Sequence, residues 1–118
     1  MNADISRARG PSFYDEGPVL RNHFQLRLFN KRNQAMSFTV ALEGAPGGYA
    51  ITGVGDGLTL EALKETARPL VVIVPKNFYQ GPRKLTLKIH SQPGNSTIRR
   101  EVDFLGPNPN LFRSQPQP

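Results

Sequence analysis

The sequence contains no cysteine, and this absence excludes several kinds of chemistry at once. The chain cannot form disulfides, thiolate zinc sites or iron–sulfur clusters from its own residues, and it has no cysteine nucleophile. Cysteine usage therefore does not identify the compartment. Tryptophan is also absent, which argues mildly against glycan binding.

Long apolar stretches are missing as well. The longest apolar run, Leu70–Val74, has the length of a strand and is far shorter than the about 18 residues that a membrane-spanning helix needs. The N-terminal segment Met1–Arg9 is polar and lacks the apolar core of a signal peptide. We therefore expect no membrane span, and a chain that either stays in the cytoplasm or is part of a larger protein.

Basic residues outnumber acidic ones, but they do not cluster in the sequence. The formal net charge is +6, yet Lys and Arg are scattered from Arg7 to Arg113 in blocks of no more than two residues, and Asp or Glu lies near several of them. A nucleic-acid interface needs a basic patch or a recognisable motif. We therefore expect no nucleic-acid partner.

Apolar and polar residues alternate in short runs, which is typical of β-strands. Eleven Gly and eleven Pro separate these runs. Phe24, Leu26 and Leu28 fall on one side of a predicted strand, and alternate residues from Met36 to Leu42 do the same. If this alternation holds, the interior must bury residues from several segments, among them Phe24, Phe38, Val72, Leu87 and Val102.

The segment from Leu85 to Phe104 predicts a β-hairpin, because two alternating runs flank the turn-forming residues 91–96. Pairing Ser91 with Ser96 brings apolar residues opposite each other and joins one pair of opposite charges. This register predicts the pairs Ile89–Ile98, Leu85–Val102 and Lys84–Asp103. It also puts Arg100 opposite Leu87 on the apolar side. Either a bulge turns Arg100 outward, or the residue lies at the rim of the sheet, where its head reaches water.

The middle of the sequence completes an all-β prediction. Leu70–Val74 is apolar on both faces and bounded by Pro69 and Pro75, which is typical of a central strand covered on both sides. Glu61–Ala67 is the only segment with helical character, over about two turns. Short strands with frequent turns predict a β-sandwich of about seven strands in two antiparallel sheets.

The two ends of the chain differ in composition from the middle. We place the domain at residues 10–107. Residues 1–9 are expected to be a flexible N-terminal segment or a cloning remnant. Residues 108–118 lack periodicity and are expected to be a disordered tail rich in Pro and Gln.

No constellation in the sequence predicts catalysis. His23 and His90 alternate with apolar residues on separate strands and should point outward, so a metal site built from them and Met36 is not expected. The chain has no Gly-x-Ser-x-Gly elbow, and its glycine-rich segments do not lead from a strand into a helix, as a nucleotide-binding loop does. The acidic pairs are expected on turns or solvated faces: Asp15–Glu16, Glu61–Glu65 and Glu101–Asp103. We expect no enzyme, and neither a metal nor a cofactor in this domain.

Four stretches of the sequence carry a further pattern: Leu20–Lys31, Phe38–Gly47, Leu58–Pro75 and Phe104–Pro107. They are similar, in the same order, to the C-terminal immunoglobulin-like domain of FixG-type proteins, also called CcoG or cytochrome c oxidase accessory proteins. The first resembles an alternating strand that ends in Asn-Lys, and the second a strand followed by Glu-Gly-x-Pro-Gly. The third resembles a strand, a short link and a second strand, and the fourth a closing Phe-x-Gly-Pro. The likeness covers about residues 7–107.

The resemblance implies an immunoglobulin-like β-sandwich on the periplasmic side of the bacterial inner membrane, soluble as an isolated domain and attached to a polytopic membrane protein. That parent protein resembles ferredoxin-type iron–sulfur proteins, and it helps to assemble the high-affinity haem–copper cytochrome c oxidase through copper handling or reduction. The cysteines that carry electrons belong to other segments. No catalytic, metal-binding or cofactor-binding residue therefore transfers to this chain.

Within this interpretation the domain works by contact with protein partners, such as oxidase subunits, assembly factors or the remainder of the parent protein. The polar link after the strand ending at Asn30 offers Lys31, Arg32 and Asn33, and the Asn30 side chain should hydrogen-bond the loop backbone. Phe78 and Tyr79 are a second candidate contact, because they follow a strand bounded by proline. Their alternative role is a cap over the end of the sandwich.

Two other functions remain open from the residues alone. Sandwich domains often bind ligands, so an extracytoplasmic domain that binds a glycan or another ligand is one alternative. A copper-binding chaperone is the other, and it requires the His and Met ligands to converge.

Overall fold

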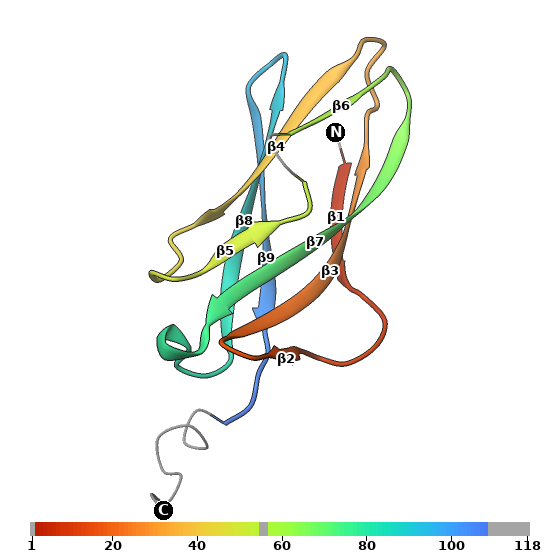
Figure 1. Ribbon diagram of the computed structural model, residues 1–118. Helices are drawn as coiled ribbons and strands as arrows, with labels where there is room; N and C mark the ends of the chain where they lie inside the picture. Colours follow the sequence, from red (N-terminus) through yellow and green to blue (C-terminus); the bar gives the residue numbers. More distant parts are fainter. Residues whose placement is uncertain (1, 55–56, 109–118) are drawn as a thin grey trace, which may run out of the picture.

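The computed structural model describes residues 2–54 and 57–108, which fold into two facing antiparallel sheets (Figure 1). The predicted all-β immunoglobulin-like sandwich is confirmed, with nine strands among the described residues where about seven were expected. The elements are β1 (Asn2–Arg7), β2 (Tyr14–Glu16), β3 (Val19–Phe29), β4 (Met36–Glu43), β5 (Ala50–Thr52), β6 (Leu58–Leu60), β7 (Glu65–Pro75), the 3-10 helix η1 (Lys76–Phe78), β8 (Arg83–Gln92) and β9 (Ser96–Phe104).

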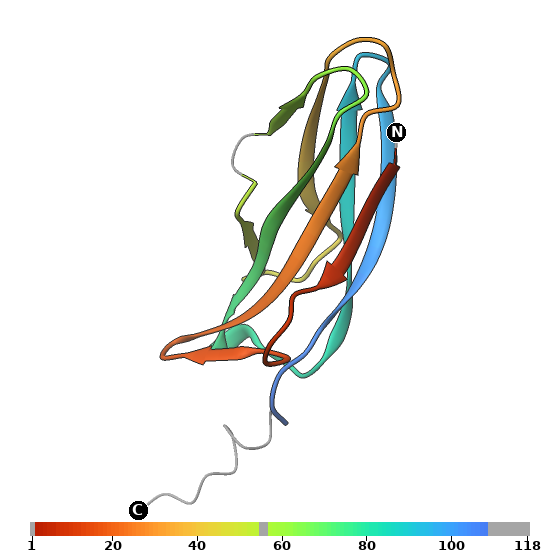
Figure 2. The same ribbon diagram turned by 90° about the vertical axis from the view of Figure 1, so that its right-hand side faces the viewer.

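Each sheet has a simple strand order. In the first sheet, called sheet A, the order is β1-β3-β7-β5, and β2 pairs with one end of β3. In the second, called sheet B, the order is β6-β4-β8-β9. Figure 2 shows the two layers nearly edge-on, with β1 and β9 running side by side along one border of the sandwich. The chain therefore leaves two long edge strands, β1 and β9, next to each other.

The core lies between the sheets, and alternation along the strands fills it. In β3 the buried residues alternate with exposed or half-buried ones along the whole strand. The five residues on which the predicted alternation depends are all buried, with exposed fractions of 8% or less: Phe24, Phe38, Val72, Leu87 and Val102. Period-two burial therefore holds in both sheets.

The β8–β9 hairpin has the predicted register. Ser91 pairs with Ser96, and the apolar and charged pairs follow as expected. Arg100 lies opposite Leu87 without a bulge, on an edge strand where its side chain is exposed. Of the two predicted outcomes for Arg100, the position at the rim of the sheet is the one observed.

The predicted helix at Glu61–Ala67 is wrong. Residues 61–64 form a turn in which Leu63 has a φ of 60°, and Glu65 already belongs to β7. Glu65 pairs with Phe29, so β7 continues alongside β3 over the full length of both strands. Pairing with β3 overrides a helical propensity that is weak over so few residues.

β7 is also longer than predicted, because it passes through Pro69 instead of starting after it. The Pro69 carbonyl faces Gly53, just beyond the end of β5. The nitrogen and carbonyl of one strand residue point to the same side, so the missing N–H of Pro69 is directed away from β3 and costs no ladder bond there. On the outer face of β7, Val71 and Ile73 are only half-buried. β7 is therefore covered fully on its inner face and only in part on its outer face, whereas full cover on both faces was expected.

The N-terminal segment is another correction. Residues 1–9 were expected to be flexible, but Asn2–Arg7 forms β1 and pairs with β3 over its whole length. Ala3 and Ile5 face the core from this strand. In the expected tail, residues 109–118 lie outside the described residues. Among the residues that are described, no helix is long and apolar enough to cross a membrane.

Candidate functional site

The predicted contact residues lie at opposite ends of the sandwich (Figure 1). Lys31, Arg32 and Asn33 belong to the β3–β4 loop, next to the β6–β7 and β8–β9 turns. Phe78 and Tyr79 lie at the other end, on η1 and just after it. The structure therefore does not join the two candidates into one surface.

Asn30 fixes the β3–β4 loop. Its side chain is fully buried, its Oδ1 accepts a hydrogen bond from the Arg32 backbone N–H at 2.9 Å, and its backbone N–H donates to Lys64. The predicted bonding of Asn30 to the loop backbone is thereby confirmed. Its Nδ2 donates to three carbonyls, those of Gln34 at 2.8 Å, Leu60 at 3.1 Å and Glu61 at 3.1 Å. One side chain thus ties the loop to the β6–β7 turn.

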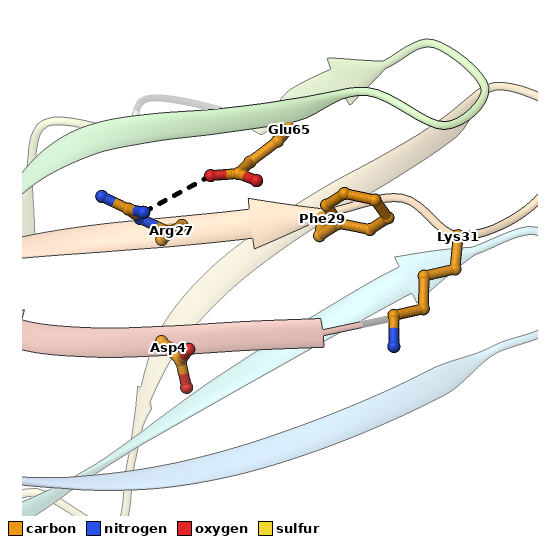
Figure 3. Close-up of a pocket in the computed structure, with 5 residues that line it drawn as sticks. All are labelled: Asp4, Arg27, Phe29, Lys31 and Glu65. Atoms are coloured by element: carbon orange, nitrogen blue, oxygen red, sulfur yellow. Dashed lines mark ion pairs between the residues drawn. The ribbon is translucent and has the colours of Figure 1, made fainter.

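A shallow pocket of about 260 Å³ lies beside this loop, on the outer face of sheet A (Figure 3). Arg27 and Glu65 form an ion pair across it at 3.5 Å, and both side chains are about half exposed. It is lined by Asp4, Arg27, Phe29, Lys31 and Glu65. Acidic and basic side chains thus surround the half-buried ring of Phe29. This combination suits contact with a surface that is partly polar and partly apolar. Sequence reasoning found only Lys31, because Asp4 joins the pocket through the unpredicted strand β1.

At the opposite end, Tyr79 is a core residue. It is 3% exposed, its ring packs against Phe104, and its hydroxyl donates to the Pro107 carbonyl at 2.8 Å. Burial, and secondarily Tyr49, raises the pKa of Tyr79. Phe78 is 49% exposed, and its ring lies against Gly48. Tyr79 therefore caps the sandwich end, as its alternative role states, and Phe78 alone presents a side chain for contact.

Replacing Tyr79 with Phe should lower the free energy of unfolding by about 1 kcal/mol at neutral pH, because the hydrogen bond to Pro107 is lost. A raised folded-state pKa means that the wild type loses stability as pH rises above the ordinary tyrosine value of about 10. The variant should lose less over that range. Urea unfolding at neutral and alkaline pH measures both effects, and equal pH dependence in the two proteins would contradict the role given to this phenol.

The histidines and Met36 do not converge. His23 lies on the outer face of sheet A, with its ring 4.5 Å from that of Tyr14. His90 lies on the outer face of sheet B, 3.1 Å from the Thr97 hydroxyl. Met36 is buried between the sheets. A copper site built from these three residues therefore does not form, and no cluster of three His, Asp or Glu suited to a metal occurs in residues 2–54 and 57–108.

Several acidic residues face basic neighbours instead of one another. Asp15 pairs with Lys76, and Glu16 with Arg21. Glu43, which sequence reasoning did not single out, makes a two-pronged contact with Arg99, and this hydrogen bond lowers the pKa of the Glu43 carboxyl. These exposed pairs suit a solvated surface.

The border between β1 and β9 carries an arginine network. Arg7 lies 4.9 Å from the centre of the Phe24 ring and donates to the buried Asn22 side chain at 3.0 Å and to the Asp103 carbonyl at 2.5 Å. In the reverse direction, Arg100 on β9 donates to the Ala3 carbonyl on β1 at 3.1 Å. Two side chains thus bridge the two edge strands.

The family assignment comes from a comparison with models of known protein families. One model matches residues 1–107, and it is described as an immunoglobulin-like fold at the C-terminus of FixG, with a proposed oxidoreductase role for FixG. The chain belongs to this FixG C-terminal family. The match begins at residue 1, in agreement with the ordered strand β1.

Solved structures show the same fold as this FixG C-terminal domain. A FixG-related protein from Vibrio parahaemolyticus superposes with a TM-score of 0.69 at 15% identity, covering 88% of this chain and 94% of that one. The ASH/PapD-like domain 7 of human CEP192 gives a TM-score of 0.54 at 10% identity over 90% and 85% of the chains. An MSP-domain-like protein, SSP-19 of Caenorhabditis elegans, gives 0.50 at 11% over 71% and 86%. A search of curated protein sequences found no significant match.

The four stretches that resemble the family form the framework of the FixG C-terminal domain. They supply the paired central strands β3 and β7, the strand β4 of the other sheet, and the end of β9. The closing stretch also holds the Asn22 clamp, in which the Asn22 side chain bonds both backbone groups of Leu105 at 2.8 Å. The shared residues are thus explained by packing and backbone bonding.

Proposed function

We propose that this FixG C-terminal domain is a non-catalytic interaction module of a FixG-type membrane iron–sulfur protein. In this proposal it lies on the periplasmic side of the inner membrane and serves the assembly of the high-affinity haem–copper cytochrome c oxidase, including its copper handling. The observation that carries the proposal is the family match over residues 1–107. Iron–sulfur chemistry would reside elsewhere in the parent protein, because this sequence has no cysteine.

The domain would act through contacts made by its two ends. Asn30 holds the loop that presents Lys31, Arg32 and Asn33, so the loop is ordered before a partner binds and loses little conformational entropy on binding. At the other end Phe78 offers an aromatic side chain on a short helix. Exposed aromatic and arginine side chains are the residue types that contribute most to protein interfaces.

The test uses full-length FixG in cells that depend on the high-affinity oxidase. Phe78→Ser at one end and the double change Arg32→Glu with Asn33→Asp at the other should each lower oxidase activity in isolated membranes several-fold, while FixG abundance is unchanged. The control is Lys88→Glu, at the centre of the outer face of sheet B. Normal oxidase activity in both end variants would refute a contact role for these residues.

A second candidate function, binding of a ligand outside the cytoplasm, rests on the pocket around Phe29. Its mixed charges and half-buried ring are compatible with a small polar ligand. Glycan-array binding that is lost in Phe29→Ala would support this alternative over the interaction module.

A further inference from the structure

Leu63 is an unusual residue at the tip of the β6–β7 turn. It is 59% exposed, and its φ of 60° places a leucine in the left-handed region that large side chains rarely adopt. Backbone strain of this kind clusters at binding sites and switch regions. The other exposed large apolar side chain among the described residues, Phe78, lies against Gly48 at the opposite end.

The surroundings of Leu63 carry a small excess of positive charge. The β3–β4 loop (residues 30–35) and the β8–β9 turn (residues 92–95) contain no Asp or Glu. Including the third turn (residues 61–64) and the pocket, the basic side chains are Arg27, Lys31, Arg32 and Lys64, and the acidic ones are Asp4, Glu61 and Glu65. Arg27 and Glu65 pair with each other. The two loops without carboxylates therefore present the cationic part of this end.

The chain also enters the sandwich at this end. Asn2 pairs with Phe29, the last residue before the β3–β4 loop, whereas β9 carries the chain away to the opposite end (Figure 2). In FixG, of which this is the C-terminal domain, the preceding part of the protein would connect here. A connection at this point holds the domain close to the membrane in which the parent protein lies, and so raises its local concentration there. A weak affinity of this end for the membrane surface is then sufficient for it to bind.

We infer that this end of the sandwich docks on an anionic lipid surface, with Leu63 inserted among the headgroups and Lys31, Arg32 and Lys64 facing their phosphates. The inference rests on the proposed function, which places the parent protein in a membrane. An apolar tip flanked by basic residues is the combination that binds the interface of a bilayer. For the β3–β4 loop end, the contact named in the proposed function is then with the lipid surface. Phe78, which is directed away from the membrane, is left for a protein partner.

The experiment exploits the absence of cysteine, which allows single labels without background thiols. Leu63→Cys and, as the matched control at the far end, Phe78→Cys are labelled with the fluorophore NBD. Each chain carries a histidine tag and is bound through nickel-chelating lipid to vesicles of equimolar phosphatidylglycerol and phosphatidylcholine. With the tag at the N-terminus, the label at position 63 should show a blue shift and a rise in emission, and the label at position 78 should show neither. Moving the tag to the C-terminus should lower the response at position 63, because the tether then holds the opposite end at the surface.

Charge dependence is measured on the untagged chain by co-sedimentation with the same vesicles. Lys31→Glu with Lys64→Glu should lower the partition coefficient at least about tenfold, and Lys88→Glu with Lys84→Glu on the outer face of sheet B should lower it less. A label at position 63 that reports water in every arrangement would overturn the inference, as would equal responses at both positions. Either result would leave the proposed oxidase role untouched, because that role is judged by oxidase activity in cells.

Discussion

Replacing Phe104 with alanine should lower the free energy of unfolding by about 3–5 kcal/mol. The ring is fully buried near the end of β9, with its centre 5.3 Å from that of Tyr49 and 6.2 Å from that of Tyr79. Its removal forfeits the transfer free energy of the ring and leaves a cavity between the rings of Tyr49 and Tyr79. Tyr79 is held by its bond to Pro107, so the site has little freedom to collapse.

The matched control is Phe78→Ala, the same substitution on a half-exposed ring in the adjoining helix. It should cost less than about 1 kcal/mol, because much of the ring already contacts water. Urea denaturation followed by circular dichroism gives both values. Similar losses for the two variants would mean that this end of the sandwich is not packed as described.

Asn30→Asp should destabilise the domain by at least about 3 kcal/mol at neutral pH. The substitution keeps the shape of the side chain but replaces the amide donor, which now satisfies the carbonyls of Gln34, Leu60 and Glu61, with a carboxylate oxygen. A buried negative charge facing three carbonyl oxygens has no compensating donor at those positions. The β3–β4 loop and the β6–β7 turn should therefore separate before the rest of the sandwich unfolds.

The loss should depend on pH. Burial among carbonyls raises the pKa of the introduced carboxyl above its unfolded value of about 3.9. The folded state then binds the proton more tightly, so the variant is least impaired below that value and loses stability as pH rises towards the folded-state pKa. Asn33→Asp, an exposed position in the same loop, is the control and should show little effect. A pH-independent deficit in Asn30→Asp would contradict this explanation.

The predictable part of this fold is the part that alternation specifies locally. The β8–β9 hairpin follows from two apolar runs around a turn, and its register follows from matching Ile89 with Ile98. The buried face of β3 follows from alternation in the same way, whereas the buried part of β7 follows from an apolar run bounded by two prolines. Asn30 is a further success, because its position at a strand end calls for a side chain that bonds the loop backbone.

The missed features depend on tertiary pairing. β1 presents only a short apolar pattern, Ala3 and Ile5, and it is a strand because β3 offers it an edge. The turn at residues 61–64 and the start of β7 depend likewise on pairing with β3, which a helical reading of Glu61–Ala67 could not anticipate. Since β1 was missed, the pocket at Asp4 and the Arg7 network could not be foreseen from the sequence. From the sequence, Tyr79 is either a contact or a cap over the sandwich end, and only its burial and its bond to Pro107 distinguish the two.

The reciprocal arginine bridges have a consequence for crowded conditions. An uncovered strand border is where identical sandwiches join into fibrils, and Arg7 and Arg100 already occupy backbone acceptors on β9 and β1. Pairing of two copies through this border should therefore be disfavoured, because a neighbouring strand would have to displace both arginines from the acceptors they occupy.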